Sequence, residues 1–444
     1  MTRWQRLALA AYSAAWWLAA PLAALYLLWR SIAQREYRRH WGERFLGRGS
    51  PPPAGRPLIW IHAVSVGETR AAQPLIEHLA RELPRASFLL THMTPTGRAV
   101  GQSILAALPG RVAQRYLPYD LRCAVARFLG EVRPSVGVIM ETEIWPNLLH
   151  ATRSAGVPML LANARLSEKS AARGQRLAAL LRPAAEAFDR IAAQSEADRD
   201  RIAHWCGKPI DVTGNLKFDL AVNDALVGAG RALRARWGAR PVWLFASTRD
   251  GEEALVLEAW LRRRGEFDSD PNLLIVPRHP QRFDEVARLI EEKGLACLRR
   301  SRGAWPAIVP PATVLLGDTM GEMGLYYATA EVALIGGSLL NFGAQNLIEA
   351  CAVGTPVVLG PSTFNFAQAA ADAIAAGAAL QVRDADEALA AMDGLCRDRG
   401  RLASMGRAAR HFAAAHRGAT ARVANIVHEL LRAGGAGAGR RYDS

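Results

Sequence analysis

Short apolar runs alternate with helical segments along most of this chain, and this alternation constrains the fold more than any other feature. The runs lie at residues 58–62, 87–91, 111–116, 135–140, 157–162, 190–193 and 210–213, and again at 242–247, 273–277, 313–317, 332–336 and 356–360. Continuous apolar strands separated by helices are typical of a parallel sheet that is covered on both faces. A less regular stretch at 214–240 divides the pattern in two. The sequence therefore predicts an α/β protein with two Rossmann-like, doubly wound domains.

Composition supports a globular protein of a reducing compartment. The chain has 444 residues, of which 50% are hydrophobic and 22% charged, so wholesale disorder is excluded. Its length suits two or three domains of about 100–200 residues each. The five cysteines are scattered and include no C-x-x-C pair. This spacing excludes a disulfide scaffold and a cysteine-rich zinc module.

The charge balance indicates a polyanionic partner. The chain carries 55 basic and 41 acidic residues, a formal net charge of +14, and almost every cation is arginine. Such an excess points to nucleic acid, an anionic membrane or phosphorylated ligands. A plain bias towards arginine explains the charge equally well. Other segments of the chain must therefore decide whether there is a polyanionic partner and which kind it is.

The N-terminal segment favours the membrane over nucleic acid. Residues 7–29 are 23 residues without a charge, which is long enough to cross a hydrocarbon core of about 30 Å. Arginines follow this run densely between residues 30 and 48. Because the more positive flank stays cytoplasmic, we expect a single N-terminal membrane anchor, with the body on the cytoplasmic side. Pro21 and the many alanines leave two alternatives, a helix that spans the membrane and one that lies in a single leaflet.

Polar residues follow the predicted strands of the first half, where ligands of such sheets gather. Glu68 comes directly after the first strand, on a turn that Gly67 permits at the start of a helix. Glu141 and Glu143 follow the fourth strand beside Trp145. Carboxylates at strand ends are costly to bury without partners, so these positions indicate a functional role.

The second half carries features of an anion site. Arg278 follows a strand, and a Gly-rich stretch from Gly336 leads to a helix with Asn346 and Glu349 at its start. A helix N-terminus can accept a phosphate, and a glutamate one turn further can accept ribose hydroxyls. The spacing matches neither a dinucleotide fingerprint nor a phosphate-binding loop. The chain also has no paired histidines of a zinc enzyme and no Gly-x-Ser-x-Gly elbow.

Ten runs, at residues 62–70, 91–98, 116–120, 141–147, 163–167, 214–219, 246–253, 277–283, 318–321 and 360–366, together resemble the Kdo transferases of lipopolysaccharide synthesis. The resemblance implies a GT-B architecture, two Rossmann-like domains that face each other across a central cleft. It also implies inverting transfer of 3-deoxy-D-manno-octulosonic acid (Kdo) from CMP-Kdo to the lipid A precursor, lipid IVA. By the same resemblance we expect the reaction to take place at the inner membrane, without a bound metal and without a cofactor.

The resemblance also implies roles for individual residues. Glu68 matches the general base, while Glu141 and Lys217 match the pair that stabilises the transition state. Contacts to CMP are implied for Pro277, Arg278, Asp318, Thr319, Met320, Asn346, Leu347, Ile348 and Glu349. Many relatives have a histidine where this chain has Gln345.

On the same grounds we expect four segments. Residues 1–50 form the anchor and its basic flank, 51–225 the acceptor-binding domain, 226–435 the CMP-Kdo-binding domain and 436–444 a disordered tail. Two other readings remain. Another GT-B enzyme, or a sugar-nucleotide epimerase, shares the nucleotide site but should lack the anchor. A non-catalytic, membrane-tethered anion-binding protein explains the charge but leaves the carboxylates at the strand ends unexplained.

Overall fold

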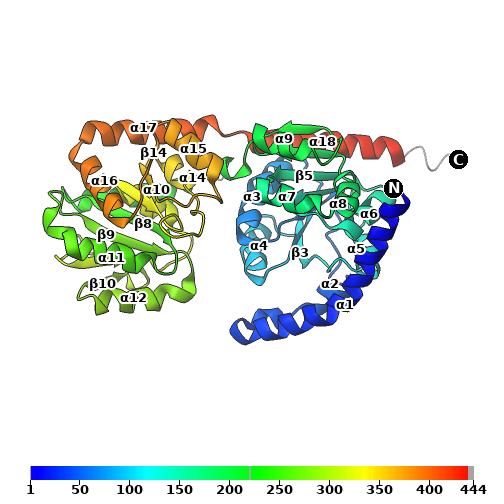
Figure 1. Ribbon diagram of the computed structural model, residues 1–444, viewed down its shortest axis with the longest axis horizontal. Coiled ribbons are helices and arrows are strands. Elements are labelled where there is room, and N and C mark those ends of the chain that lie inside the picture. The colour runs from blue at the N-terminus through cyan, green and yellow to red at the C-terminus, as the bar shows by residue number, and fades with distance from the viewer. Residues whose placement is uncertain (1, 220–221, 439–444) are drawn as a thin grey trace. The chain divides into compact units, whose positions relative to one another are not determined.

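The computed structural model describes residues 2–219 and 222–438, and the chain divides into two compact units (Figure 1). The first unit contains residues 1–220 and 417–444, and the second contains residues 221–416. Each unit is built around its own seven-stranded parallel sheet. The predicted pair of Rossmann-like domains is therefore confirmed.

The first sheet has the strand order β3-β2-β1-β4-β5-β6-β7. Its strands are β1 (Leu58–His62), β2 (Ser87–His92), β3 (Val112–Tyr116), β4 (Val136–Met140), β5 (Met159–Ala164), β6 (Arg190–Ala193) and β7 (Ile210–Val212). The helices of this unit are α1 (Arg3–Ala33), α2 (Trp41–Leu46), α3 (Val66–Glu82), α4 (Pro95–Ala107), α5 (Arg122–Val132), α6 (Pro146–Ser154), α7 (Glu168–Gln175), α8 (Ala178–Ala185), α9 (Glu196–Ala203) and α18 (Ala419–Ala438). Every residue of β1, β2, β4 and β5 is buried, as expected of strands covered on both faces.

The second sheet has the order β10-β11-β9-β8-β12-β13-β14. Its strands are β8 (Val242–Thr248), β9 (Asn272–Pro277), β10 (Ala296–Arg299), β11 (Thr313–Leu316), β12 (Val332–Ile335), β13 (Val357–Leu359) and β14 (Ala379–Gln381). The helices are α10 (Asp224–Arg236), α11 (Glu252–Arg263), α12 (Phe283–Glu292), α13 (Met323–Thr329), α14 (Ile348–Val353), α15 (Ala367–Ala375), α16 (Ala385–Arg397) and α17 (Arg399–Ala415). The strand order reverses between β8 and β12, and in the first unit between β1 and β4. Such reversals leave a crevice at the carboxyl ends of the strands.

We expected the second domain to end at residue 435. The structure corrects this boundary, because helix α18 belongs to the first unit. The apolar side chains of α18, including Val423 and Val427, are buried in the same core as β1 and β4. Asp219 accepts hydrogen bonds from the backbone N–H groups of Gly418 (2.7 Å) and Thr420 (2.5 Å), which ties the start of α18 to this unit. Of the expected tail, residues 436–438 belong to α18 and residues 439–444 lie outside the described residues.

Three elements of the second unit were not predicted. Strands β10 and β14 have four and three residues and are partly exposed, so they lack the continuous apolar pattern of the other strands. The stretch that reads as irregular contains helix α10, which lies closely against α13. A Cβ atom at Gly230 of α10 would come within 2.4 Å of the Leu325 carbonyl oxygen, so this contact requires glycine.

Helix α1 lies at one edge of the first unit, and its N-terminal part is beside α6 (Figure 1). Residues 3–32 are long and apolar enough to cross a membrane, although core helices and signal sequences meet the same criterion. Figure 1 shows that α1 changes direction part-way along its length, as expected of a helix that contains Pro21. A short 3-10 helix, η1 (Arg35–Arg38), links α1 to α2.

Candidate functional site

Glu68 lies in the first turn of α3, directly after the central strand β1. The helix starts at Ser65, whose hydroxyl oxygen accepts a hydrogen bond from the Glu68 backbone N–H (3.4 Å). In return, the Glu68 carboxylate accepts hydrogen bonds from the Ser65 hydroxyl (2.9 Å) and the Val64 backbone N–H (2.8 Å). This reciprocal cap fixes the Glu68 carboxylate at the reversal point of the sheet. Glu68 is only 8% exposed there.

The environment of Glu68 weakens its acidity. Burial, together with the negative charge of Glu141, raises the pKa of Glu68 to about 7. Burial also raises the pKa of Glu143, to which Glu141 again contributes. Three carboxyl groups therefore influence one another at the adjoining ends of β1 and β4. A carboxylate with a pKa near 7 is well matched to proton transfer at neutral pH.

Glu141 forms an ion pair with Lys217. The Lys217 Nζ and Glu141 Oε1 atoms are 2.9 Å apart, and both side chains are 18% exposed. Glu141 adopts a φ of 59°, a left-handed conformation that costs a glutamate about 1–3 kcal/mol. Residues in this conformation cluster at functional sites, where the surrounding structure holds them. The structure thus brings Glu68, Glu141 and Lys217 together.

Two residues that the sequence analysis did not assign hold Lys217 in place. Lys217 belongs to a 3-10 helix, η2 (Leu216–Asp219). The Asn163 side-chain oxygen accepts a hydrogen bond from the Leu216 backbone N–H (3.0 Å), at a point where β5 shifts its register on β6. At the other end of η2, Asp219 caps α18 as described above. Asn163 also has a left-handed φ of 56°, a conformation that asparagine adopts more readily than most residues.

Two buried histidines near the start of α3 are electrically neutral. His62 ends β1, and its Nδ1 atom is 2.9 Å from the Thr91 hydroxyl oxygen. The His92 Nδ1 atom is 3.2 Å from the Ala63 carbonyl oxygen and 3.3 Å from the Thr69 hydroxyl oxygen. Burial lowers the pKa of His62 to about 3 and that of His92 to about 4. Neither ring supplies positive charge at pH 7, whereas Lys217 forms an ion pair with Glu141.

In the second unit, Arg278 follows β9 and gathers with other cations. Its Nε–H donates to the Gln345 side-chain oxygen (3.1 Å), and its backbone N–H donates to the Thr248 carbonyl (2.9 Å). Burial lowers the pKa of the neighbouring His279, and the positive charges of Arg249, Arg278 and Arg282 lower it further. The loop after β9 is therefore a positive environment that suits an anion. Pro277 is buried at the end of β9 and precedes Arg278.

Glu252, to which the sequence analysis gave no role of its own, organises the Gly-rich loop. Its buried carboxylate accepts hydrogen bonds from the backbone N–H groups of Gly337 (2.6 Å) and Leu339 (3.0 Å). It also accepts one from the Arg249 N–H (2.8 Å). At Gly336 a Cβ atom would come within 2.4 Å of the Ser247 carbonyl oxygen, so the ends of β12 and β8 meet only because this residue is glycine.

The residues expected to contact CMP differ in what they offer. Asn346 donates to the Glu349 carboxylate (3.1 Å) and accepts from the Ile348 N–H (3.0 Å), so it holds the turn that leads into α14. The side chains of Leu347 and Ile348 are buried in the core, which leaves only their backbone for a ligand. Helix α14 has six residues, and the N–H of its first residue, Ile348, already donates to Asn346.

Asp318, Thr319 and Met320 follow β11. Burial raises the pKa of Asp318, but hydrogen bonds from Ser301 and Arg299 outweigh it and hold that pKa below its ordinary value. The Asp318 oxygens accept from the Ser301 N–H (2.7 Å) and the Arg299 Nε–H (2.6 Å), so this carboxylate orders the protein. The Thr319 hydroxyl contacts the Tyr326 hydroxyl (2.5 Å), while Met320 is 57% exposed.

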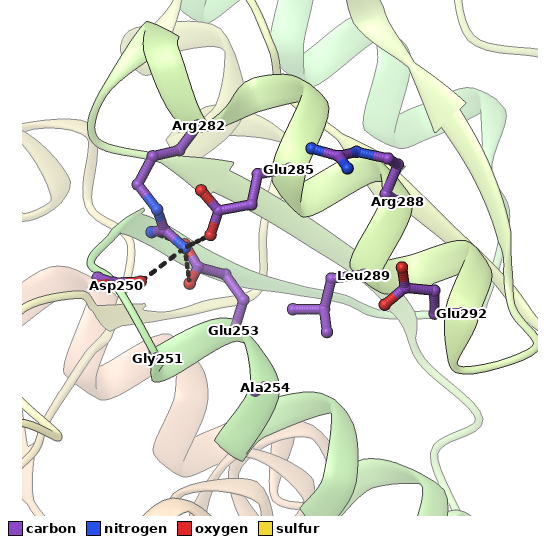
Figure 2. Close-up of a pocket in the computed structure, with 9 residues that line it drawn as sticks. All are labelled: Asp250, Gly251, Glu253, Ala254, Arg282, Glu285, Arg288, Leu289 and Glu292. Atoms are coloured by element: carbon purple, nitrogen blue, oxygen red, sulfur yellow. Dashed lines mark hydrogen bonds and ion pairs between the residues drawn. The ribbon is translucent and has the colours of Figure 1, made fainter.

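A pocket of about 290 Å³ lies between α11 and α12 (Figure 2). Arg282 donates across it to Glu253 (2.8 Å) and Glu285 (3.1 Å). The lining contains four carboxylates and two arginines, so its formal charge is negative. This charge opposes a nucleotide phosphate, and none of the expected CMP contacts lines the pocket.

Two parallel-sheet units, each with polar residues at a reversal of strand order, define an enzyme of the GT-B class. The family described as 3-deoxy-D-manno-octulosonic-acid transferase matches residues 39–220. The chain is 46% identical over 421 residues to the 3-deoxy-D-manno-octulosonic acid transferase of Bordetella pertussis, covering 92% of this chain and 97% of that protein. It is 36% identical to the enzyme of the same description from Haemophilus influenzae, covering 93% and 96%. The chain belongs to the 3-deoxy-D-manno-octulosonic acid transferase family, and it is a glycosyltransferase.

The fold also matches a solved structure of different activity. The UDP-GlcNAc 2-epimerase of Neisseria meningitidis superimposes with a TM-score of 0.56 and covers 84% of this chain and 99% of its own. Its sequence identity is 13%, so this match concerns the fold alone. The expected GT-B fold and the expected family are therefore both confirmed, whereas the roles of individual residues stay predictions.

Proposed function

We propose that this glycosyltransferase transfers Kdo from CMP-Kdo to the lipid A precursor, lipid IVA, at the cytoplasmic face of the inner membrane. The observation that carries the proposal is the group of Glu68, Glu141 and Lys217 at the end of β1 and β4, in a chain of the Kdo transferase family. The doubly phosphorylated acceptor fits the net charge of +14 and the N-terminal apolar helix.

Glu68 is the proposed general base. Its pKa of about 7 leaves a large fraction ionised at neutral pH, and a raised pKa makes the carboxylate a stronger base than an ordinary glutamate. It removes the proton from the acceptor hydroxyl as that oxygen attacks the anomeric carbon of Kdo. The bond from that carbon to the CMP phosphate breaks, and the electron pair leaves with the phosphate. Attack opposite to the leaving group inverts the anomeric centre.

Glu141 and Lys217 are proposed to stabilise the transition state. Glycosyl transfer develops positive charge on the sugar ring, which a nearby carboxylate stabilises. The ammonium of Lys217, 2.9 Å from Glu141 Oε1, orients that carboxylate and balances part of its charge. Because the φ of Glu141 is unfavourable, its position is set by the protein before substrate binds.

The second unit is proposed to hold the CMP part of the donor. Arg278 and the cations near His279 suit the phosphate, and Asn346 and Glu349 offer an amide and a carboxylate to the nucleoside. Met320 is exposed and can contact the nucleotide directly, whereas Asp318, Leu347 and Ile348 act through the loops that they order. No metal ion is part of this proposal.

The test is transfer by purified protein with CMP-Kdo and lipid IVA in the presence of a chelator, read by mass spectrometry of the lipid. The expected product is lipid IVA that carries Kdo, with release of CMP. A requirement for added magnesium would contradict the metal-free mechanism. Release of CMP without any modified lipid, with several phosphorylated glycolipids tried, would contradict the proposed acceptor.

A further inference from the structure

One face of helix α1 is a continuous apolar stripe that the protein itself does not cover. Its large side chains recur every three or four residues from Leu18 to Ile32, two more lie near the helix N-terminus, and all are between 60% and 79% exposed. The stripe consists of Trp4, Leu7, Leu18, Leu22, Leu25, Trp29 and Ile32. A soluble protein does not leave such a stripe in water, so it has a partner.

The opposite face of α1 is attached to the first unit near its N-terminal end. Ser13 is buried, and its hydroxyl donates to the Asn147 side-chain oxygen of α6 (2.8 Å). Trp16 stacks on Tyr119 with ring centroids 5.7 Å apart. Asp120, which is fully buried, accepts from the Asn147 backbone N–H (2.9 Å). These polar contacts belong to the folded unit, and a bilayer core could not replace them.

The chain returns to the same unit immediately after α1. Ser31 is buried and accepts a hydrogen bond from Arg38 Nε (3.0 Å) in η1. In α2, Glu43 accepts from Arg98 (2.6 Å) and from the Tyr116 backbone N–H (2.7 Å), which joins the segment to α4 and β3. Both flanks of the apolar stretch are therefore held by one folded unit.

The part of α1 beyond the Trp16 attachment is too short to span a bilayer. Residues 17–33 complete the helix, and at 1.5 Å per residue they extend about 26 Å, against about 30 Å for a hydrocarbon core. A single crossing would also place the two flanks on opposite sides of the membrane. We propose that α1 does not cross the membrane but is buried in one leaflet, with both flanks on the same side. This inference rests on the membrane attachment proposed above.

The partner that fits this surface is an anionic leaflet. Exposed arginines lie directly beyond the apolar stripe, namely Arg30, Arg35, Arg38 and Arg39. Each such charge near a negative surface contributes about 1 kcal/mol. Trp17, Tyr26 and Trp29 are exposed along the same helix and suit the headgroup region. A second protein chain would match the apolar stripe but not this adjoining positive cluster.

Topology is tested with the full chain in which Thr2→Cys or Glu36→Cys is introduced at an exposed position. Intact spheroplasts are treated with a membrane-impermeant maleimide, and the labelled peptides are mapped. We expect neither cysteine to react before lysis and both to react after lysis, together with the exposed Cys123. Reaction of Thr2→Cys in intact spheroplasts would overturn the inference, because it requires a spanning helix.

Attachment itself is tested by flotation with vesicles of phosphatidylglycerol and phosphatidylethanolamine. We expect the doubly substituted Leu18→Glu/Leu25→Glu chain to bind at least tenfold less than the wild type. The matched control is Ile308→Glu, which places a glutamate at an 82% exposed apolar position of the other unit and should bind normally. Failure of the wild type to float would refute the membrane attachment, whereas flotation with an externally labelled Thr2→Cys would refute only the in-leaflet placement. Loss of self-association in the double variant with unchanged flotation would show that a second copy covers the stripe.

Discussion

The two units place opposite kinds of charge at equivalent positions of the same fold. In the first unit, the strand ends at the reversal point carry carboxylates, and burial shifts the pKa of Glu68 to about 7. In the second unit, the corresponding loops carry arginines, among them Arg278, and backbone N–H groups organised by Glu252. A buried carboxylate can move a proton, whereas guanidinium groups bind anions without reacting.

The backbone devices that present these groups are nonetheless alike. Asn163 in the first unit and Ser247 in the second both have a left-handed φ, and both lie where a strand shifts its register on its neighbour. Such bulges re-aim side chains at the end of a strand. Under the proposed function, the same scaffold serves chemistry in one unit and nucleotide binding in the other.

The largest expected effect separates these two roles at Glu68. Glu68→Gln preserves the size and most hydrogen bonds of the side chain but removes its basicity, so turnover should fall by roughly 10²–10⁴-fold. CMP binding, measured by calorimetry, should remain unchanged. If turnover fell by less than tenfold, the base would lie elsewhere, and Glu141 and Glu143 would be the next candidates.

The pH dependence of stability follows from the same group. Burial raises the pKa of Glu68 from about 4.5 in the unfolded chain to about 7 in the folded protein. The folded state therefore binds the proton more tightly than the unfolded chain. The resulting contribution to the free energy of unfolding is present in full below pH 4.5 and is lost as the pH rises through 7. The loss is about 3 kcal/mol.

The measurement is urea unfolding of the wild type and Glu68→Gln between pH 4.5 and 8.5. Because glutamine does not ionise, the variant should gain stability relative to the wild type as the pH rises. In the wild type, kcat/KM should rise about tenfold per pH unit below 7 and level off above it. Parallel stability curves for the two proteins would show that Glu68 has an ordinary pKa.

Some features of the two units can be predicted from the sequence, and others cannot. Strands such as β1 and β4 were predictable because they are continuous apolar runs, and Glu68 because it directly follows one. Asn163 and Glu252 were not predictable, because their partners lie 53 and 85 residues away along the chain. The return of α18 to the first unit likewise depends on a distant contact with Asp219.

The next effect concerns binding in the second unit. Arg278→Ala removes a cation beside the proposed phosphate site, and CMP affinity measured by calorimetry should fall about 10- to 100-fold, the value of a charged hydrogen bond. The matched control is Arg288→Ala, which removes an arginine from the acidic pocket of Figure 2 and should leave the affinity unchanged. The reverse result would place the nucleotide in that pocket.

The smallest effect is expected at Gln345, the position where the family resemblance led us to expect histidine. Its side-chain oxygen accepts from Arg278 Nε at 3.1 Å, so it positions the guanidinium rather than replacing it. Gln345→Ala removes one hydrogen bond to a charged group that remains partly solvated, so CMP affinity should fall only about fivefold. Gln345→His should recover most of this loss, because a neutral imidazole nitrogen can accept the same bond.

The double variant Arg278→Ala/Gln345→Ala should bind no more weakly than Arg278→Ala alone, since the two side chains act as one unit. Additive losses in that cycle would mean that Gln345 contacts the nucleotide by itself.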